Sequence, residues 1–225
     1  MNDLMIKNVV DGVIKFRADH KLFPCAECQS YGSLERWRQV FWRLKLIGQN
    51  DNLYGGAGYG NISHRIQGAR FLISGSQTGA QPNLYADGYA CVDDVFFAEN
   101  AVTSRGEVLP SSESMTHAAV YVANPAISMV LHVHSPLIWA HYSALEVSTI
   151  AADIGYGTLA MAEAIRVEVK RLSARGQNHG EIVMLGHEDG VIAWGETAEL
   201  ASMRMLDLYT RATRLKMQEK FVKPR

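Results

Sequence analysis

Two histidines one residue apart are the strongest sign of chemistry in this sequence. His132 and His134 follow an apolar run, and side chains two residues apart in an extended strand point to the same face. Two imidazoles side by side at the end of an apolar strand form an incomplete metal site, which a third nitrogen donor and a carboxylate would complete. For such a pair taken alone, two satisfied core histidines are the alternative.

A third imidazole is available between two later apolar runs. His187 follows Ile182-Val183-Met184-Leu185 and precedes Gly190-Val191-Ile192-Ala193-Trp194. We therefore expect it on a tight connection between two core strands, which is a rigid place for a ligand. His179 lies in a loop before the first of these runs and is expected in solvent. His187 is preferred over the remaining candidates, which are His20, His64, His117 and His141.

The carboxylate is expected from Glu113, which begins a predicted helix leading directly into the histidine strand. A short helix packed back onto its following strand can bring this side chain near the cation. Three neutral imidazoles leave a coordination position open for water or a substrate oxygen. Glu113 would then act either as a fourth ligand or as a general base beside a polarised carbonyl. The alternative is a first-turn glutamate favoured by the helix dipole.

An anion site is indicated at the beginning of the same helix. Ser111 and Ser112 precede Glu113, and the amides and positive dipole end of a helix suit a phosphate or a carboxylate. Simple capping of the helix by a serine is the alternative. Gly60-Asn61 and Thr78-Gly79 offer further amides and hydroxyls, because glycine lets a backbone approach a ligand closely.

Hydrophobic spacing and turn residues predict the elements that position these side chains. The predicted helices cover Ile6–Ala18, Leu34–Ile47, Glu113–Ala123, Pro136–Ala140, Leu159–Leu172 and Thr197–Met217. The predicted strands cover Asn61–Ile66, Arg70–Ser74, Gly88–Val92, Val95–Ala98, Ile127–Val133, Glu181–Leu185 and Val191–Trp194. No repeat or linker divides the chain. This pattern favours a single α/β or α+β domain over residues 1–225 with a largely antiparallel sheet.

Composition excludes several classes of function. The 225 residues are 48% hydrophobic and 20% charged, with a formal net charge of −1 that gives no general attraction for nucleic acid or anionic membranes. No secretion signal and no stretch of membrane-spanning length is present, so a cytoplasmic protein is expected. Cys25 and Cys28 form a C-x-x-C without a second such pair, which favours plain reduced thiols over zinc or redox chemistry.

Taken together and in order, the motifs resemble the class II aldolase/adducin family over about residues 6 to 215. The family includes fuculose-phosphate aldolase and ribulose-phosphate 4-epimerase. The motifs that carry the resemblance are Gly60-Asn61-Ile62-Ser63, Phe71-Leu72-Ile73-Ser74 with Thr78-Gly79, Ser111-Ser112-Glu113, His132-Val133-His134 and the turn at His187.

The resemblance implies an α/β/α three-layer fold around a mainly antiparallel sheet, in a homotetramer with active sites between subunits. It implies one divalent cation per subunit on His132, His134 and His187, commonly zinc, with manganese, cobalt, nickel or magnesium as alternatives. Glu113 would be the catalytic acid/base that also ligates the cation when no substrate is present. The positions that match phosphate-holding residues are Asn61, Thr78, Gly79, Ser111 and Ser112. Asp153 resembles the proton-shuttling aspartate of the epimerases, or it is an ordinary loop aspartate.

Two segments depart from the family's usual pattern. The loop Gly75-Ser76-Gln77-Thr78-Gly79 has a glycine where a proline is usual, and one extra residue, which bears on phosphate recognition. The turn Gly186-His187-Glu188-Asp189-Gly190 lacks the usual glycine directly after the histidine and adds two carboxylates.

The expected activity is a metal-dependent lyase that cleaves or forms a carbon–carbon bond through a metal-stabilised enediolate. The substrate would be a small hydroxy-carbonyl or sugar-phosphate-like compound. A metal-dependent decarboxylase of a hydroxy or keto acid and a 4-epimerase are the enzymatic alternatives. The alternative without catalysis is an adducin-like interaction module, which is expected to lose its metal ligands.

Overall fold

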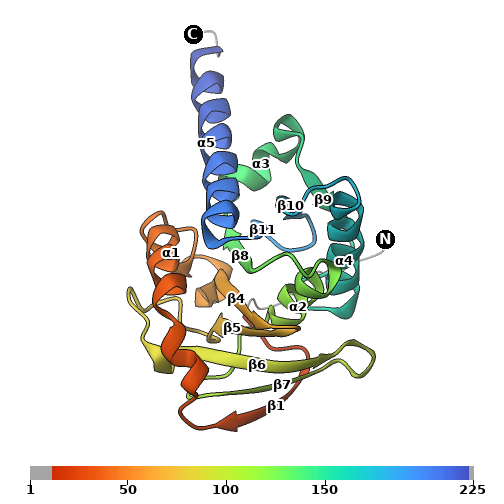
Figure 1. Cartoon of the computed structure of the whole chain (residues 1–225). Helices are drawn as coiled ribbons and strands as arrows, with labels where there is room; N and C mark the ends of the chain where they lie inside the picture. Colours follow the sequence, from red (N-terminus) through yellow and green to blue (C-terminus); the bar gives the residue numbers. More distant parts are fainter. Residues whose placement is uncertain (1–11, 223–225) are drawn as a thin grey trace, which may run out of the picture.

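The computed structural model describes residues 12–222 as a broad sheet with helices on both faces (Figure 1). The helices are α1 (Gly32–Arg43), α2 (Ser114–Ala123), α3 (Pro136–Leu145), α4 (Leu159–Ser173) and α5 (Ala198–Val222). The strands of the main sheet are β1 (Arg17–Leu22), β4 (Asn61–Gln67), β5 (Arg70–Ser74), β6 (Tyr89–Phe96), β7 (Ala101–Gly106), β8 (Met129–His134), β9 (Ser148–Ile150), β10 (Gly180–Met184) and β11 (Gly190–Gly195). A small second sheet pairs β2 (Gly48–Gln49) with β3 (Gly58–Tyr59).

The nine strands of the main sheet run in the order β1-β7-β6-β5-β4-β8-β11-β10-β9. The two outermost pairs, β1 with β7 and β9 with β10, are parallel, and the neighbours between them are antiparallel. The expected mainly antiparallel α/β architecture is therefore confirmed.

Each face of the sheet has its own hydrophobic core. On one face, α1, α3 and α5 pack over Leu131 and Val133 of β8. On the other, α2 and α4 pack over Val130 of the same strand and Trp194 of β11. The alternation along β8 makes it a central strand buried on both sides, and His132 and His134 lie on the α2 and α4 side. This gives the three layers that the resemblance implied.

The helix predicted over Ile6–Ala18 is wrong for residues 12–18, which the structure describes and which are not helical. Residues 6–11 lie outside the described part of the chain. Residues 12–16 are irregular, and β1 begins at Arg17 and pairs in parallel with β7. The apolar spacing of this segment fits an edge strand as well as a helix, and the pairing with β7 selects the strand. Within that pair, His20 Nδ1 lies 2.9 Å from Ser104 Oγ.

Two strands that the sequence did not indicate are β7 and β9. β7 has the polar sequence Thr103-Ser104-Arg105 at its centre, and β9 is only three residues long. The two strands predicted over Gly88–Val92 and Val95–Ala98 form one strand, β6, with an irregularity in its pairing between Val92 and Asp94.

The three cysteines are free, buried thiols, as expected for Cys25 and Cys28. Cys28 Sγ donates a hydrogen bond to Tyr89 O (3.3 Å), and burial raises the pKa of Cys91 to about 12.

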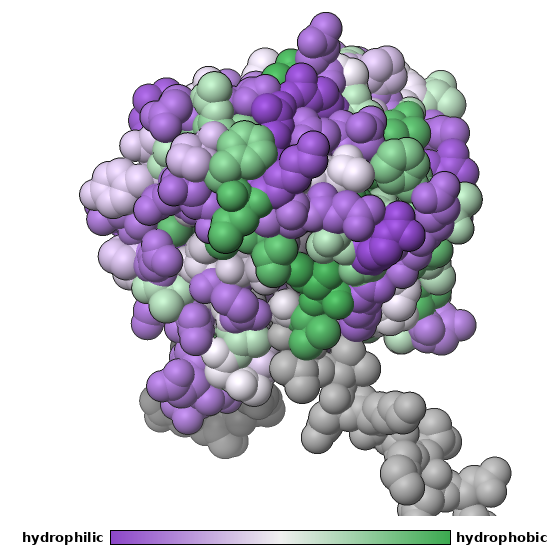
Figure 2. All heavy atoms as spheres, turned by 90° about the horizontal axis from the view of Figure 1, so that it is seen from below, coloured by the Kyte–Doolittle hydropathy of each residue, from purple (hydrophilic) through white to green (hydrophobic). Residues whose placement is uncertain are grey.

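Seen from below, the surface is mostly hydrophilic with a strip of apolar side chains (Figure 2). None of the described helices combines the length and the apolar character that a membrane crossing requires.

Candidate metal centre and active site

Three histidines from two places in the chain converge on one point. His132 and His134 lie on β8, and His187 lies in the turn between β10 and β11. One ring nitrogen from each residue lies within 4.8 Å of the others, and the ring centroids are 4.7–5.0 Å apart. Among the described residues this is the cluster able to hold a metal ion, and His179 is not part of it.

The turn that carries His187 is rigid. Its backbone N–H donates to Met184 O (3.0 Å), and its carbonyl accepts from Gly190 N (2.9 Å). The preceding Gly186 packs against the loop before α4 so closely that a Cβ there would lie 1.9 Å from Ile154 O. A side chain at that position would displace the turn and therefore the imidazole.

Burial keeps His132 and His134, the two imidazoles on β8, in the neutral form that binds a metal ion. The pKa values of His132 and His134 are held well below the ordinary range, first by burial and then by the other histidines of the cluster. His132 Nδ1 lies 3.1 Å from Val191 O, and donation to this carbonyl leaves Nε2 with its lone pair toward the cluster. A divalent cation fits this donor set, because the three rings are buried and converge, and burial keeps His132 and His134 uncharged.

Glu113 lies beside the histidines, where the sequence predicted it. It is the residue directly before α2, and it is only 2% exposed. Its Oε1 atom lies 4.0 Å from His187 Nδ1. This position suits either a ligand to the cation or a base acting on a substrate next to it.

Tyrosines from separate loops enclose the cluster, and no pattern in the sequence indicated them. The ring of Tyr54 meets His134 edge-on (4.4 Å between centroids), and its hydroxyl donates to Asp189 Oδ2 (2.7 Å). Tyr156 stacks on His187 (4.5 Å), and Lys15 Nζ lies 3.7 Å from the centre of the Tyr156 ring. These rings limit access of water to the cluster and fix the orientation of two imidazoles.

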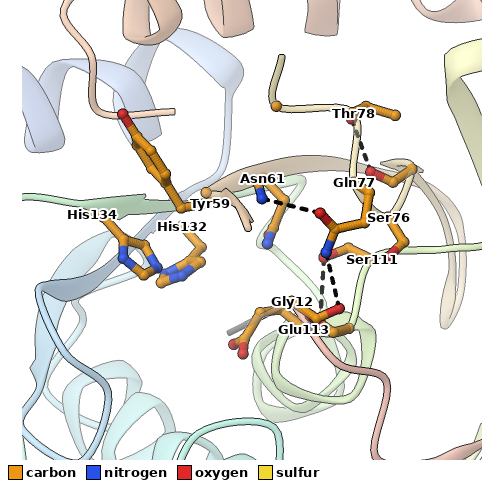
Figure 3. Close-up of a pocket in the computed structure, with 15 residues that line it drawn as sticks. Gly12, Tyr59, Asn61, Ser76, Gln77, Thr78, Ser111, Glu113, His132 and His134 are labelled. Atoms are coloured by element: carbon orange, nitrogen blue, oxygen red, sulfur yellow. Dashed lines mark hydrogen bonds between the residues drawn. The ribbon is translucent and has the colours of Figure 1, made fainter. Parts of the chain in front are cut away.

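A pocket extends from His132, His134 and Glu113 toward the loop between β5 and β6 (Figure 3). All five residues expected at an anion site line it, and they are Asn61, Thr78, Gly79, Ser111 and Ser112. Asn61 lies directly opposite His132 in the pairing of β4 with β8, so the two side chains share a face. Ser111 Oγ also accepts from Glu113 N (3.3 Å), the residue directly before α2, whereas no side chain caps the first turn of this helix.

Side chains of helix α1 donate hydrogen bonds to backbone carbonyls of the loop over residues 75–81. Arg38 is 1% exposed, and its guanidinium donates to Thr78 O (3.1 Å) and Gln81 O (2.7 Å). Trp42 Nε1 donates to Gly79 O (3.0 Å). These bonds turn three carbonyls of the loop toward α1.

The sequence pattern of the Class II Aldolase and Adducin N-terminal domain matches residues 50–214, which is most of the chain. The chain belongs to the class II aldolase/adducin family. Class II aldolases use a divalent metal, and the histidine cluster of this member can hold one.

Relatives within the family carry several activities in their names. Methylthioribulose-1-phosphate dehydratase of Gluconacetobacter diazotrophicus is 30% identical over 165 residues, which are 65% of this chain and 76% of the relative. The structure of l-fuculose-1-phosphate aldolase from Thermus thermophilus has a TM-score of 0.63 at 19% identity, covering 88% of this chain and 98% of that one. A sugar-phosphate aldolase from Thermotoga maritima has a TM-score of 0.64 at 13% identity, covering 85% and 95%. The two solved structures share the fold of this chain.

Both departures from the family pattern have visible consequences. In the loop after β5, Gln77 has a left-handed backbone (φ 58°) and lines the pocket. In the turn after β10, Asp189 accepts the hydrogen bond from Tyr54, whereas Glu188 is exposed. The extra carboxylate nearer the cluster therefore already has a partner.

Asp153 and His117 lie outside the histidine cluster, the first exposed and the second buried. Asp153 is exposed in the turn before Tyr156 and does not line the described pocket, and its role in proton transfer stays a prediction. His117, one of the histidines not preferred as the third ligand, is fully buried. Its Nδ1 atom lies 2.7 Å from Ser63 Oγ, so it contacts the strand beneath the cluster.

Proposed function

We propose that the protein is a divalent-metal-dependent lyase that cleaves or forms a carbon–carbon bond in a small hydroxy-carbonyl compound. The observation that carries the proposal is the buried histidine cluster with the Glu113 carboxyl 4.0 Å from His187. His132, His134 and His187 would hold the cation, for which we propose zinc.

When bound, the cation would polarise the substrate's oxygens and stabilise the negative charge that develops as the bond breaks. Glu113 would move the proton to or from the carbon atom next to the carbonyl. Its place beside the histidine cluster, 4.0 Å from His187, puts the carboxyl group within reach of a substrate held by the cation. Tyr54, Tyr59 and Tyr156 would exclude water from the reacting carbon.

Loss of water is the second candidate, because the relative at 30% identity is named as a dehydratase. The same Glu113 would remove a proton next to the carbonyl, and a hydroxyl on the neighbouring carbon would leave. Decarboxylation and epimerisation use the same cation. The products separate the four reactions: an aldehyde, an anhydro product, carbon dioxide or an epimer.

The interaction-module alternative is disfavoured because the complete ligand set is present and buried. A module without chemistry has no need for three converging, buried imidazoles beside a buried carboxyl group.

The test compares Glu113→Gln with Glu188→Gln in the zinc-loaded protein, on short hydroxy-ketones and hydroxy acids with and without a terminal phosphate. Glu188 is an exposed carboxylate next to a proposed ligand and serves as the matched control. We expect Glu113→Gln to keep its zinc and lose about 10²–10⁴-fold in kcat, the usual contribution of a general acid or base. Glu188→Gln is expected to keep activity within threefold of wild type. Near-normal kcat in Glu113→Gln would remove Glu113 from the mechanism.

A further inference from the structure

We propose that Gln77 excludes phosphate from the pocket beside the histidines, so that the substrate is a short hydroxy-carbonyl compound without a phosphate group. This inference rests on the proposed function and names the substrate class of the same site. It separates this chain from relatives whose names include sugar phosphates.

The side chain of Gln77 crosses the pocket and is held at both ends. Its Oε1 atom accepts a hydrogen bond from Gly58 N (3.0 Å), and its Nε2 atom donates to Gly12 O (3.4 Å). Figure 3 shows the carboxamide between Asn61 and Ser111, two of the residues expected to hold an anion. The side chain therefore occupies the place where the anion would bind.

Little space is left beside it. The pocket lined by Glu113, His132 and His134 retains about 20 Å³ of enclosed space, which is room for about one water molecule, and it opens to solvent at the exposed Gln77 side chain. A phosphate group has five heavy atoms and does not fit in this enclosed space unless the Gln77 side chain moves out into solvent.

Two donors beside the Gln77 side chain are also engaged. Phosphate oxygens at neutral pH mostly accept hydrogen bonds, yet the Gly58 N–H is bound by Gln77, and the Thr78 hydroxyl donates to Gly75 O (2.8 Å). No lysine or arginine is among the described residues that line the pocket, and Glu113 adds a carboxyl group there. A doubly charged group would therefore meet neutral donors and one acid, with no cationic side chain among the described lining residues.

The loop backbone cannot retreat to make room. A Cβ on Gly79 would lie 2.0 Å from Gly48 O, so the backbone of this loop is already in contact with β2. Gln77 itself has a φ of 58°, which is uncommon for a residue other than glycine. The loop is fixed behind by Arg38 and Trp42. Only the Gln77 side chain is able to move.

A substrate end group smaller than phosphate suits the space that remains beside Gln77. The amides of Asn61 and Gln77 both lie in the pocket, and each carries N–H groups able to donate to one hydroxyl or carboxylate oxygen. The expected substrate thus presents a hydroxyl or carboxylate oxygen to these amides and its reacting oxygens to the cation.

The test is calorimetric titration of inorganic phosphate into four zinc-loaded proteins: wild type, Gln77→Ala, Gln77→Gly and Gln81→Ala. Gln77→Ala removes the side chain, and Gln77→Gly also relieves the backbone. Gln81 is an exposed glutamine of the same loop and serves as the matched control. We expect both Gln77 variants to bind phosphate at least tenfold more tightly than wild type and Gln81→Ala. Phosphate bound to the zinc itself would be equal in all four proteins and cannot produce this difference.

Zinc content is measured on the same samples, so a variant that fails to fold is recognised by its loss of zinc. In that case Gln77→Asn, which shortens the side chain and tolerates this backbone, takes its place. Equal phosphate affinity in all proteins, or weaker affinity in Gln77 variants that keep their zinc, would overturn the proposal. The titration needs no turnover, so its failure is distinct from failure of the proposed lyase activity.

Discussion

His117 shows how burial sets the chemistry of a single residue next to the site. Its ring is fully buried on α2, four residues after Glu113, and burial lowers its pKa to about 3. It contacts Ser63 Oγ, which also lies 2.7 Å from the Tyr121 hydroxyl. A neutral ring is therefore built into the helix that carries Glu113.

The lowered pKa of His117 predicts a pH dependence of stability. In the unfolded chain this histidine has a pKa of about 6.5, so below that pH the unfolded state binds a proton that the folded state refuses. Its contribution to stability is fully present above about pH 6.5 and is lost as the pH falls toward 3. In metal-free protein, we expect His117→Gln to reduce the slope of unfolding free energy between pH 6 and 5 by up to about 1.4 kcal/mol per pH unit.

Urea denaturation at several pH values measures this slope. His179→Gln, a substitution in the loop before β10, is the control and is expected to leave the slope as in wild type. An unchanged slope in His117→Gln would mean that this ring is protonated in the folded protein.

At the scale of elements, α1 supports the loop that shapes the pocket. Within the helix, Arg38 lies 3.6 Å from Glu35, and both side chains are buried. Glu35 also accepts hydrogen bonds from Tyr89 Oη (2.7 Å) and Leu84 N (3.0 Å). The pair thus joins α1 to both ends of the segment between β5 and β6.

We predict that Arg38→Met destabilises the protein by about 3–5 kcal/mol, because it leaves the buried Glu35 carboxylate without its cation. Arg36→Met changes an exposed arginine of the same helix and is expected to cost less than about 0.5 kcal/mol. Adding Glu35→Gln to Arg38→Met is expected to restore part of the loss. Chemical denaturation gives the three values, and a loss below about 1 kcal/mol in Arg38→Met would show that the pair is not a structural support.

The sequence predicted best those helices and strands whose own residues carry a clear hydrophobic spacing. Apolar spacing and bounding turns indicated α1, α4 and the strands that carry the histidines, and an H-x-H pair on a strand fixes its own geometry. β1 and β7 were missed or misread because their pairing depends on a contact between distant segments. The place of Gln77 in the pocket and the contact of Tyr54 with His134 were likewise missed, because only the fold brings the loops that carry them to the cluster.

At the scale of the whole molecule, the two cores leave α5 extending past the sheet (Figure 1). Large apolar residues on this helix are exposed, including Met203 (57%) and Met217 (55%). Exposed apolar surface of this kind is suited to contact between subunits. The single domain over residues 1–225 stays a prediction.

We predict a homotetramer with active sites between subunits, as the family resemblance implies. Light scattering coupled to size exclusion measures the mass directly, and four chains per particle are expected. Substituting Met203 and Met217 together with glutamate is predicted to shift the mass toward smaller species, whereas glutamate at exposed Lys170 of α4 leaves it unchanged. A monomer at micromolar concentration would contradict the prediction.

Binding of one divalent cation by three buried imidazoles is measured by metal analysis. Wild type, His187→Gln and His179→Gln are stripped with chelator, reloaded with zinc, desalted and measured by mass spectrometry of the metal. We expect one zinc per chain in wild type and in His179→Gln, and loss of most of it in His187→Gln. Equal zinc in all three proteins, or none in wild type, would contradict this expectation.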